Sequence, residues 1–474
     1  MSPMTERQAD VVVIGSGPGG YVAAIRLAQL GNQVLVVERD ALGGVCLNWG
    51  CIPSKAMIAA SHLVEAIKGG APMGIKVDGL SVDMAAMKTW KDGIVKRLTG
   101  GVGELFKRNG IELLSGEAAF ASATEIKVKS REGVVTVRTK KTLIASGARP
   151  VRLPGLDIDG QRFITSKEAL DLTAPPEHFL VVGGGIVGCE IGTYMAKLGS
   201  QVTIVELAPQ LLTGTDPDLV RVVERGMKKR KIAVHLSSKV EHVEHGKQRM
   251  EATLSTPNGD VVVGADKVLV AVGFKPNTES LNLAAVGVRT DPRGHVVVDE
   301  RLQTSNPTIY AIGDVIGPPY LAHKASKEGL VAAETMSGHN VVLDVRAMPA
   351  AIFTDPEIAT VGLTEAQARE KGFEVKVGSF PFAANGRALA AMAPDGLVKL
   401  VADARDDTLL GCHIVGHEAS NLIAEATLAI EMGATAADIG LTVHPHPTLS
   451  ETLMEAAHVV EGHAIHIFQQ AGRR

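Results

Sequence analysis

One pattern occurs twice in this chain, and it constrains the fold more than any other feature. Residues 10–20, DVVVIGSGPGG, are an apolar run that ends in Gly15, Gly17 and Gly20. The following segments, YVAAIRLAQLG and NQVLVVERD, predict a helix and a second strand that ends at Glu38. Glycines in this order allow a tight turn, close approach of the backbone to a pyrophosphate, and close helix–strand packing. The helix N-terminus then faces the phosphates, and the acid accepts hydrogen bonds from a ribose.

The second copy covers residues 179–206. FLVVGGGIVG supplies Gly183, Gly185 and Gly188, CEIGTYMAKLGS predicts a helix, and QVTIVE ends at Glu206. In both copies the acid stands 23 positions after the first glycine. A single motif of this kind can be a packing turn without a nucleotide, but two copies in the same context predict two dinucleotide sites.

Two dinucleotide sites in one redox enzyme are most simply filled by a tightly bound flavin and an exchangeable nicotinamide. The acid of the second copy indicates which nicotinamide cofactor, NAD or NADP, binds there. Glu206 would repel a 2′-phosphate, and the following stretch IVELAPQLL contains no Arg or Lys to accept one. The sequence therefore predicts FAD and NAD as cofactors, and NAD over NADP.

Composition and charge exclude several other functions. The chain of 474 residues has a net charge of -4, which gives no electrostatic case for nucleic acid or an anionic membrane surface. The chain contains no run of about 18 apolar residues, so the sequence predicts no membrane-spanning helix. The N-terminus, MSPMTERQAD, lacks the apolar core of a signal peptide, and four cysteines without such a signal indicate a reducing compartment. We expect a cytoplasmic protein with no nucleic acid and no membrane partner.

The pattern of elements predicts an α/β fold with two Rossmann-like dinucleotide-binding domains plus a C-terminal α+β domain. A helical pattern extends over about 56–115, and short strands follow over 117–145. A strand, a turn with Asp314 and a helix start are expected within 309–325. From about 347 onward, alternating strand patterns and two helices indicate a separate domain.

Two of the four cysteines lie in the stretch LGGVCLNWGCIPSK. Cys46 and Cys51 follow Glu38 by 8 and 13 residues, which places them near the first dinucleotide. Five positions is a spacing that a disulfide bond can span. A zinc site would need more ligands, since Cys189 and Cys412 stand alone, and two ordinary buried thiols are a further alternative. A redox-active dithiol beside the flavin is the hypothesis that we prefer.

This stretch resembles the signature of the flavin-dependent pyridine nucleotide-disulfide oxidoreductases, and CLNWGCIPSK is most similar to the members that oxidise dihydrolipoamide. Other matches follow in register: GDV with Asp314, AHKA at 322–325 and HPHPTLSE at 444–451. The resemblance covers essentially the whole chain. It implies an FAD-binding domain in residues 1–150 that is completed by 276–346, an NAD-binding domain in 151–275, and an interface domain in 347–474 that forms a homodimer.

The resemblance also implies partners. These are lipoylated carrier domains, which present dihydrolipoamide, and the acyltransferase core of 2-oxo acid dehydrogenase complexes or the glycine cleavage system. Related branches differ at named positions. Glutathione reductases usually have Val and Lys where Leu47 and Ser54 stand, and mercuric reductases carry an extra C-terminal cysteine pair that HAIHIFQQAGRR lacks. The family usually has Arg where Phe274 stands in AVGFKPNT, which concerns contacts on the nicotinamide side.

Residue chemistry and the resemblance together suggest catalytic roles. Cys51 is the inner sulfur that exchanges electrons with FAD, and Cys46 faces outward to exchange disulfides with the substrate. A substrate dithiol needs a base, and the imidazole of His446 suits this task. Glu451 would hold that imidazole in one tautomer from a helix start. In the family, this base serves the cysteines of the other subunit.

Further residues are expected at the cofactors. Lys55 would lie near the reactive edge of the flavin and pair with Glu190, Asp314 would bind the ribityl chain, and the helix that begins at Ala322 would stabilise reduced flavin. The expected FAD residues are Gly15, Gly17, Gly20, Glu38, Lys55, Gly147, Asp314 and Ala322. The expected residues on the NAD side are Gly183, Gly185, Gly188, Glu190, Glu206 and Gly273. We expect no metal site, and we expect structural roles for His444, Cys189 and Cys412.

Three functions remain compatible with these patterns. The first is NAD-dependent oxidation of dihydrolipoamide, and the second is a sibling disulfide reductase with another small substrate. The third is a redox sensor or structural subunit that binds nucleotide without turnover. The presence of Cys46, Cys51, His446 and Glu451 together disfavours the third, since a binding module needs none of this chemistry.

Overall fold

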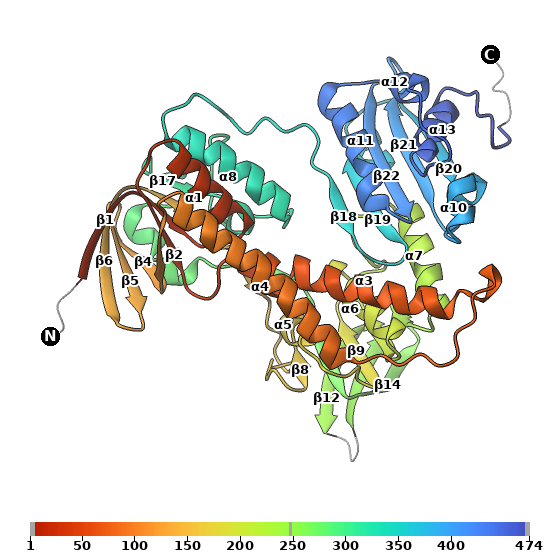
Figure 1. The fold of residues 1–474 in the computed structure, drawn as a ribbon, viewed down its shortest axis with the longest axis horizontal. Coiled ribbons are helices and arrows are strands. Elements are labelled where there is room, and N and C mark those ends of the chain that lie inside the picture. The colour runs from red at the N-terminus through yellow and green to blue at the C-terminus, as the bar shows by residue number, and fades with distance from the viewer. Residues whose placement is uncertain (1–4, 246–248, 470–474) are drawn as a thin grey trace.

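The computed structural model describes residues 5–245 and 249–469. Figure 1 shows an N-terminal sheet on the left, a second sheet region at the lower centre, and a C-terminal domain at the upper right. The long helices α3 (Cys51–Lys68) and α4 (Met84–Arg108) cross the middle of the molecule between these parts. The predicted fold class is confirmed, while the predicted boundaries at 150, 275 and 346 stay predictions.

The first sheet has the strand order β3-β2-β1-β6-β5-β4, and β17 adds to β6. Its parallel pairs join β1 to β2 and β6, β2 to β3, and β6 to β17, whereas β4, β5 and β6 are antiparallel. The strands are β1 (Thr5–Ile14), β2 (Val34–Glu38), β3 (Glu112–Ser115), β4 (Glu117–Ser122), β5 (Glu125–Ser130), β6 (Gly133–Ile144) and β17 (Ile309–Ala311). Residues Val11–Ile14 are buried on both faces, as expected for the centre of a parallel sheet.

Residues after 275 complete this first part of the fold. Strand β17 pairs with β6, and helix α8 (Ala322–Met336) lies beside helix α1 (Pro18–Gln29) in Figure 1. Arg26 on α1 donates to Glu334 on α8 at 2.7 Å. Short helices η2 (Glu279–Leu281), η3 (Leu283–Val286) and η4 (Gly313–Ile316) connect these elements. The predicted strand, turn and helix start around Asp314 are therefore confirmed.

The helical pattern expected over 56–115 is interrupted twice. Helix α3 ends at Lys68, and only η1 (Ala71–Met73) is helical before α4 begins at Met84. Helix α4 ends at Arg108, and Gly110 has a φ of +67°, a conformation that ends helices. The expectation of one helical stretch up to residue 115 was wrong, because β3 already begins at Glu112.

The second sheet has the parallel order β11-β10-β9-β15-β8. Its strands are β8 (Phe163–Ile164), β9 (His178–Val182), β10 (Gln201–Val205), β11 (Ala233–His235) and β15 (Lys267–Val270). Helices α5 (Ser166–Ala169), α6 (Ile186–Lys197) and α7 (Pro217–Lys229) belong to this part. An antiparallel sheet of β12 (Lys239–His245), β13 (Met250–Thr256) and β14 (Gly259–Ala265) lies next to it.

Two short antiparallel strands connect the first and second parts. They are β7 (Ala148–Pro150) and β16 (Phe274–Pro276). The C-terminal domain is an antiparallel sheet in the order β18-β19-β22-β21-β20. Its strands are β18 (Ala350–Ile352), β19 (Glu357–Gly362), β20 (Val375–Pro381), β21 (Leu397–Asp403) and β22 (Leu409–Gly416).

The C-terminal domain contains more helix than the sequence pattern indicated. The long helices are α11 (Ala419–Met432) and α13 (Glu451–Val460), and three short ones were not expected: α9 (Glu365–Glu370), α10 (Gly386–Ala390) and α12 (Ala436–Leu441), with the turn η5 (Phe382–Ala384). Helices of six residues or fewer carry too few periodic positions to show an amphipathic pattern. In the described part of the chain, we find no helix of the length and apolar character needed to cross a membrane.

Candidate active site

In the first glycine turn, only the middle glycine, Gly17, has open space beside its Cα atom. A Cβ at Gly15, which has a φ of +102°, would lie 2.3 Å from the Ala145 carbonyl oxygen. A Cβ at Gly20 would lie 2.1 Å from the Gly15 carbonyl oxygen, whereas a Cβ at Gly17 would meet nothing within 4 Å. The outer glycines thus permit tight packing, and the middle one faces open space where backbone can approach a phosphate.

The second turn repeats this geometry. A Cβ at Gly183 would lie 2.4 Å from the Ala271 carbonyl oxygen, and a Cβ at Gly188 would lie 2.0 Å from the Gly183 carbonyl oxygen. Gly185 again faces open space. Helices α1 and α6 begin directly after the middle glycines, Gly17 and Gly185. Both turns therefore fit a pyrophosphate at a helix N-terminus.

Each turn is braced by its acid. The Oε2 atom of Glu38 accepts hydrogen bonds from Ser16 N at 2.9 Å and from Ser16 Oγ at 2.7 Å. The Oε2 atom of Glu206 accepts a hydrogen bond from Gly184 N at 2.6 Å. Both carboxylates line the cavity described next. A carboxylate fixed beside such a turn could accept hydrogen bonds from the ribose of a bound dinucleotide.

A single cavity of about 1460 Å³ contains both glycine turns and both paired cysteines. Gly147 and Gly273 line it where the strands β7 and β16 connect the two parts, with φ angles of +68° and +113°. Asn277 N donates to the Gly147 carbonyl at 2.9 Å, and Val151 N donates to the Gly273 carbonyl at 3.0 Å. One continuous space therefore joins the two glycine turns and the cysteine pair.

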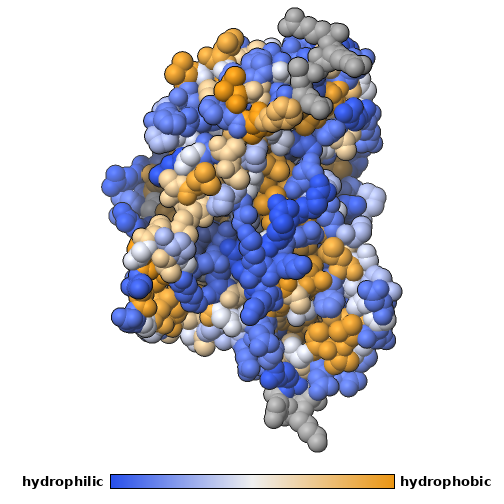
Figure 2. Space-filling view, turned by 90° about the vertical axis from the view of Figure 1, so that its right-hand side faces the viewer, coloured by the Kyte–Doolittle hydropathy of each residue, from blue (hydrophilic) through white to orange (hydrophobic). Residues whose placement is uncertain are grey.

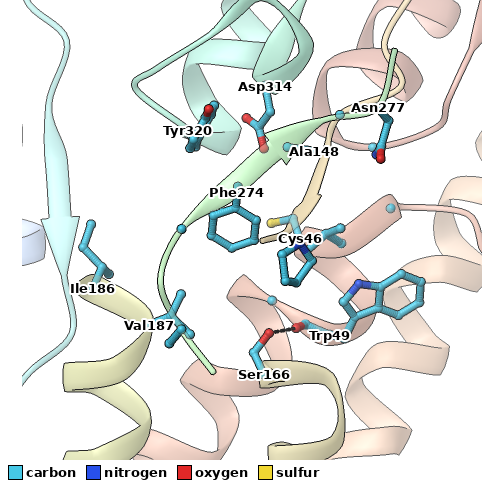
Figure 3. Close-up of a pocket in the computed structure, with 18 of the residues that line it drawn as sticks. Cys46, Trp49, Ala148, Ser166, Ile186, Val187, Phe274, Asn277, Asp314 and Tyr320 are labelled. Atoms are coloured by element: carbon cyan, nitrogen blue, oxygen red, sulfur yellow. Dashed lines mark hydrogen bonds between the residues drawn. The ribbon is translucent and has the colours of Figure 1, made fainter. Parts of the chain in front are cut away.

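The paired cysteines lie on either side of a helix break. Cys46 is on α2 (Gly44–Trp49), and Cys51 is the first residue of α3. Both are free thiols in the structure. The sequence predicts a pair that can form a disulfide, and the structure places both sulfurs at the wall of the same cavity. Figure 3 shows Cys46 and Trp49 among the side chains that line the cavity.

The two thiols differ in acidity because they interact with each other. The pKa of Cys51 is lowered, mainly because the Cys46 thiol donates a hydrogen bond to its sulfur, and the nearby Lys55 ammonium adds to this effect. The pKa of Cys46 is raised because its proton is held in that hydrogen bond and because the group is buried. Cys51 is thus the first of the pair to become a thiolate, the form that reacts.

Lys55 connects the cysteine helix with the second part of the fold. Its Nζ atom lies 2.8 Å from Glu190 Oε2, and Glu190 lies on α6 with its side chain 5% exposed. The predicted contact between these two residues is confirmed. The sequence did not indicate Phe353, whose backbone N donates to Glu190 Oε1 at 2.8 Å and whose ring lies 4.4 Å from Lys55 Nζ.

Asp314 lies on η4 and lines the cavity. Burial raises the pKa of its carboxyl group to about 6. Such a group gains from any ligand hydroxyl that donates to it, because burial has removed its water. Helix α8 begins at Ala322, as expected, and this residue also lines the cavity.

Aromatic residues also line the cavity, among them Phe274, which stands where the family usually has Arg. Phe274 and Tyr320 meet edge to face, with ring centroids 6.1 Å apart, and both are drawn in Figure 3. The Tyr320 hydroxyl lies 2.9 Å from His295 Nε2, and His295 Nδ1 lies 3.0 Å from Asp291 Oδ2. Trp49 is covered by the Lys167 ammonium at 4.4 Å. None of these contacts has a local motif that could have indicated it.

The expected base lies outside this cavity. His446 Nδ1 is 2.8 Å from Glu451 Oε1, and Glu451 begins α13 as predicted. The His446 side chain is 80% exposed, and neither residue lines the cavity of its own chain. One chain therefore does not bring His446 together with Cys46 and Cys51.

Structural roles were expected for His444, Cys189 and Cys412. His444 Nε2 lies 2.7 Å from Glu425 Oε1, and its side chain is 4% exposed, as suits a structural histidine. Cys189 and Cys412 are fully buried, as expected, and burial raises the pKa of both thiols. Within the described ranges, no group of three or more His, Cys, Asp or Glu side chains is arranged to hold a metal ion.

Comparison with known proteins agrees with this geometry. Residues 9–329 match the family model described as pyridine nucleotide-disulphide oxidoreductase, and residues 348–457 match the dimerisation domain of the same family. The chain is 45% identical to a dihydrolipoyl dehydrogenase of Geobacillus stearothermophilus, over 97% of this chain and 98% of that protein. It is 46% identical to a dihydrolipoyl dehydrogenase of Thermus scotoductus, over 97% and 99%.

Solved structures have the same architecture. LpdA from Mycobacterium tuberculosis superimposes with a TM-score of 0.88 at 27% identity, over 96% of this chain and 99% of that one. The flavoprotein disulfide reductase RclA from Escherichia coli, as its Cu(II) complex, gives a TM-score of 0.85 at 26% identity, over 96% and 100%. These matches, together with the two glycine turns and the cysteine pair, show that the chain belongs to the pyridine nucleotide-disulphide oxidoreductase family.

Proposed function

We propose that this chain is an NAD-dependent dihydrolipoyl dehydrogenase, which oxidises dihydrolipoamide to lipoamide and reduces NAD+ to NADH. The observation that carries the proposal is the Cys46–Cys51 pair within the cavity that also contains both glycine turns. A dithiol in the same space as two dinucleotide sites is suited to passing an electron pair between a thiol substrate and a nicotinamide. The relatives at 45% and 46% identity that bear this name support the choice of substrate.

FAD is assigned to the first site and NAD to the second. Helix α2, which carries Cys46, packs against the first turn, since a Cβ at Gly44 would lie 2.7 Å from the Cα atom of Gly17. The cofactor that stays bound should be the one next to the dithiol. When bound there, FAD supplies a carrier that accepts an electron pair from the dithiol and passes it to the nicotinamide as a hydride equivalent. Glu206, in the second turn, favours NAD over NADP by charge.

The thiol chemistry requires two exchange steps. In the oxidised enzyme, a thiolate of dihydrolipoamide attacks Cys46 Sγ, the Cys46–Cys51 bond breaks, and Cys51 leaves as a thiolate. The second substrate thiolate then attacks the substrate sulfur of the mixed disulfide, which releases cyclic lipoamide and the Cys46 thiolate. Two electrons have moved from substrate to enzyme. His446 accepts the proton of one substrate thiol, the proton of the other ends on the released Cys46, and Glu451 holds the imidazole in one orientation.

Other residues prepare the site for these steps. The Lys55 ammonium stabilises the Cys51 thiolate, and Glu190 fixes that ammonium. Asp314 is a hydrogen-bond acceptor for the ribityl chain of FAD. The N-terminus of α8 at Ala322 offers backbone N–H groups and a positive helix end to negative charge on reduced flavin. In the reduced pair, Cys46 holds a proton in its hydrogen bond to the Cys51 sulfur.

We further propose a homodimer in which His446 of one chain serves the cysteines of the other. The 80% exposure of His446 and its absence from its own cavity support this arrangement. Leu428, Met432, Leu441 and Val443 of the same domain are 61–93% exposed, which suits an interface. Figure 2 shows hydrophobic residues at the surface in the upper part of the molecule, where this domain lies in Figure 1.

The proposed physiological partners follow from the substrate. Lipoylated carrier domains would present dihydrolipoamide to the outward cysteine, Cys46, and the acyltransferase core of a 2-oxo acid dehydrogenase complex, or the glycine cleavage system, would hold those carriers. The cytoplasm remains the expected compartment.

The direct test measures NAD+ reduction by dihydrolipoamide, followed as NADH absorbance, with purified flavin-containing protein. The Cys46→Ser variant should lose this activity, while Cys412→Ala, at a buried cysteine of the C-terminal domain, should retain it. Reduced glutathione and NADP+ serve as alternative substrates. A protein that turned over glutathione but not dihydrolipoamide would be a sibling disulfide reductase, and the proposal would be rejected.

A further inference from the structure

Phe353 follows strand β18 of the C-terminal domain, yet it contacts the helix that carries Cys51. Its ring centroid lies 4.4 Å from Lys55 Nζ, and its backbone N donates to Glu190 Oε1 at 2.8 Å. Lys55 Nζ in turn donates to Glu190 Oε2 at 2.8 Å. Three residues from three parts of the chain, on α3, on α6 and after β18, thus form a closed set of contacts at the wall of the cavity.

A lysine side chain needs more than one contact to have a fixed position. Its four-carbon stem is flexible, and ordering it costs conformational entropy. Glu190 is buried and binds the ammonium from one side, but the Lys55 side chain remains 30% exposed toward the cavity. The ring of Phe353 provides a second contact, because a cation within about 6 Å of a ring centroid is attracted to its face.

The Lys55 ammonium favours the thiolate forms of both Cys46 and Cys51, and Cys51 lies on its own helix. Lys55 is four residues after Cys51 on α3, so the two side chains lie on the same face of the helix. The titratable groups that face Cys51 are Cys46 on α2, Tyr21 on α1, Lys55 on its own helix and Glu190 on α6. Lys55 is the cation in this set.

We propose that Phe353 is a positioning residue: it holds the Lys55 ammonium beside Cys51 and thereby stabilises the Cys51 thiolate. The C-terminal domain is then part of the redox centre of its own chain, in addition to any role at an interface. The inference rests on the proposed role of Cys51 as the inner thiolate.

The shape of the contact separates this role from simple packing. A leucine at position 353 would fill much of the same space and would keep the backbone hydrogen bond to Glu190, but it has no aromatic face. A tyrosine would keep the face. Phe353→Leu therefore removes the cation–π contact and Phe353→Tyr keeps it, while both keep the backbone hydrogen bond to Glu190.

The test measures the pH dependence of Cys51 alkylation by iodoacetamide in the flavin-containing Cys46→Ser protein. The modified Cys51 peptide is quantified by mass spectrometry, so that the buried Cys189 and Cys412 do not interfere. Phe353→Leu should move the midpoint to higher pH and lower the reaction rate below the midpoint about threefold, the size expected for an exposed cation–π contact. Phe353→Tyr should restore the parent midpoint. Flavin content and melting temperature are recorded for each variant, and Phe353→Met replaces Phe353→Leu if the latter does not fold.

Lys55→Met provides the second arm. This change should move the midpoint further than Phe353→Leu does, and adding Phe353→Leu to it should have no further effect, because the ring acts through the ammonium. An equal shift from Phe353→Leu in the presence and absence of Lys55 would overturn the inference. A shift with Lys55→Met and none with Phe353→Leu would overturn it as well, while leaving the proposed function intact. If neither variant moved the midpoint, Lys55 would not stabilise the Cys51 thiolate, and the inference would be overturned.

Discussion

The imidazole of His446 is held by Glu451, with 2.8 Å between Nδ1 and Oε1, and it lies outside the cavity that contains the cysteines of the same chain. The second oxygen of Glu451 accepts a hydrogen bond from Thr448 N at 2.8 Å. These contacts lower the pKa of Glu451 although partial burial raises it, so the carboxylate stays ionised. Nδ1 of His446 is then the protonated nitrogen, and Nε2 is free to accept a proton from a substrate thiol.

Glu451→Ala should therefore lower the turnover of dihydrolipoamide by about 10²-fold, the usual contribution of an oriented acid–base group. Oxidation of NADH by an artificial acceptor should change little, because that reaction needs no base at the dithiol. Steady-state rates for both reactions provide the check, with the exposed His417→Gln as a matched control. Equal losses in the two reactions would indicate a general structural defect instead.

Cys46→Ser and Cys51→Ser should differ in their absorption spectra. Cys46→Ser leaves the Cys51 thiolate beside oxidised flavin, and a donor–acceptor contact of this kind produces a long-wavelength band. Cys51→Ser should lack that band, since Cys46 faces outward. Both variants should lose lipoamide turnover and keep oxidation of NADH by artificial acceptors. Identical spectra for the two would mean that the inner and outer assignments are wrong.

Glu206→Ala should change the choice of nicotinamide. Removing the carboxylate abolishes the hydrogen bonds expected with the NAD ribose and the repulsion of a 2′-phosphate, so the KM for NADH should rise about tenfold. The ratio of kcat/KM for NADH to kcat/KM for NADPH should fall. Flavin content should not change, because Glu206 lies in the second turn. A wild-type protein that preferred NADPH would contradict the proposed role of Glu206.

Asp314→Asn should stabilise the flavin-free protein at alkaline pH. Burial raises the pKa of Asp314 to about 6, above its ordinary value of 3.8, so the folded state binds this proton more tightly than the unfolded state. The charged form is therefore destabilising above pH 6, and stability is gained as the pH falls through 6. The melting temperature of the variant should exceed that of wild type at pH 8, and the difference should shrink at pH 5. The exposed Asp344→Asn should show no such pH-dependent difference.

The parts of this site that the sequence predicts are those that depend on neighbours along the chain. A glycine turn requires only a strand, three glycines and a helix, so both turns and both acids could be identified. The contact between Lys55 and Glu190 came from family resemblance. Phe353 could not be identified, because its contact joins residues about 300 positions apart and no local pattern records it.

The errors in the predicted fold have a similar cause. The helical pattern over 56–115 is correct for α3 and α4, but periodicity alone does not show that the chain leaves the helix between Lys68 and Met84. The pairing of His446 with Glu451 was expected from their spacing, but the position of His446 relative to the cysteines came from family resemblance alone, because no local pattern shows its exposure.

The central claim is that each active site takes its cysteines from one chain and its base from the other, and mixed dimers test it most directly. Cys51→Ser and His446→Ala are prepared separately, and each should be nearly inactive with dihydrolipoamide. The two are then dissociated, mixed equally and allowed to reassociate. In a mixed dimer with two-fold symmetry, one site has both lesions and the other has neither. Random pairing makes about half of the dimers mixed, so activity should recover to about a quarter of wild type. Activity that stayed at the background of the parents, with mixed dimers verified by mass spectrometry, would contradict the claim.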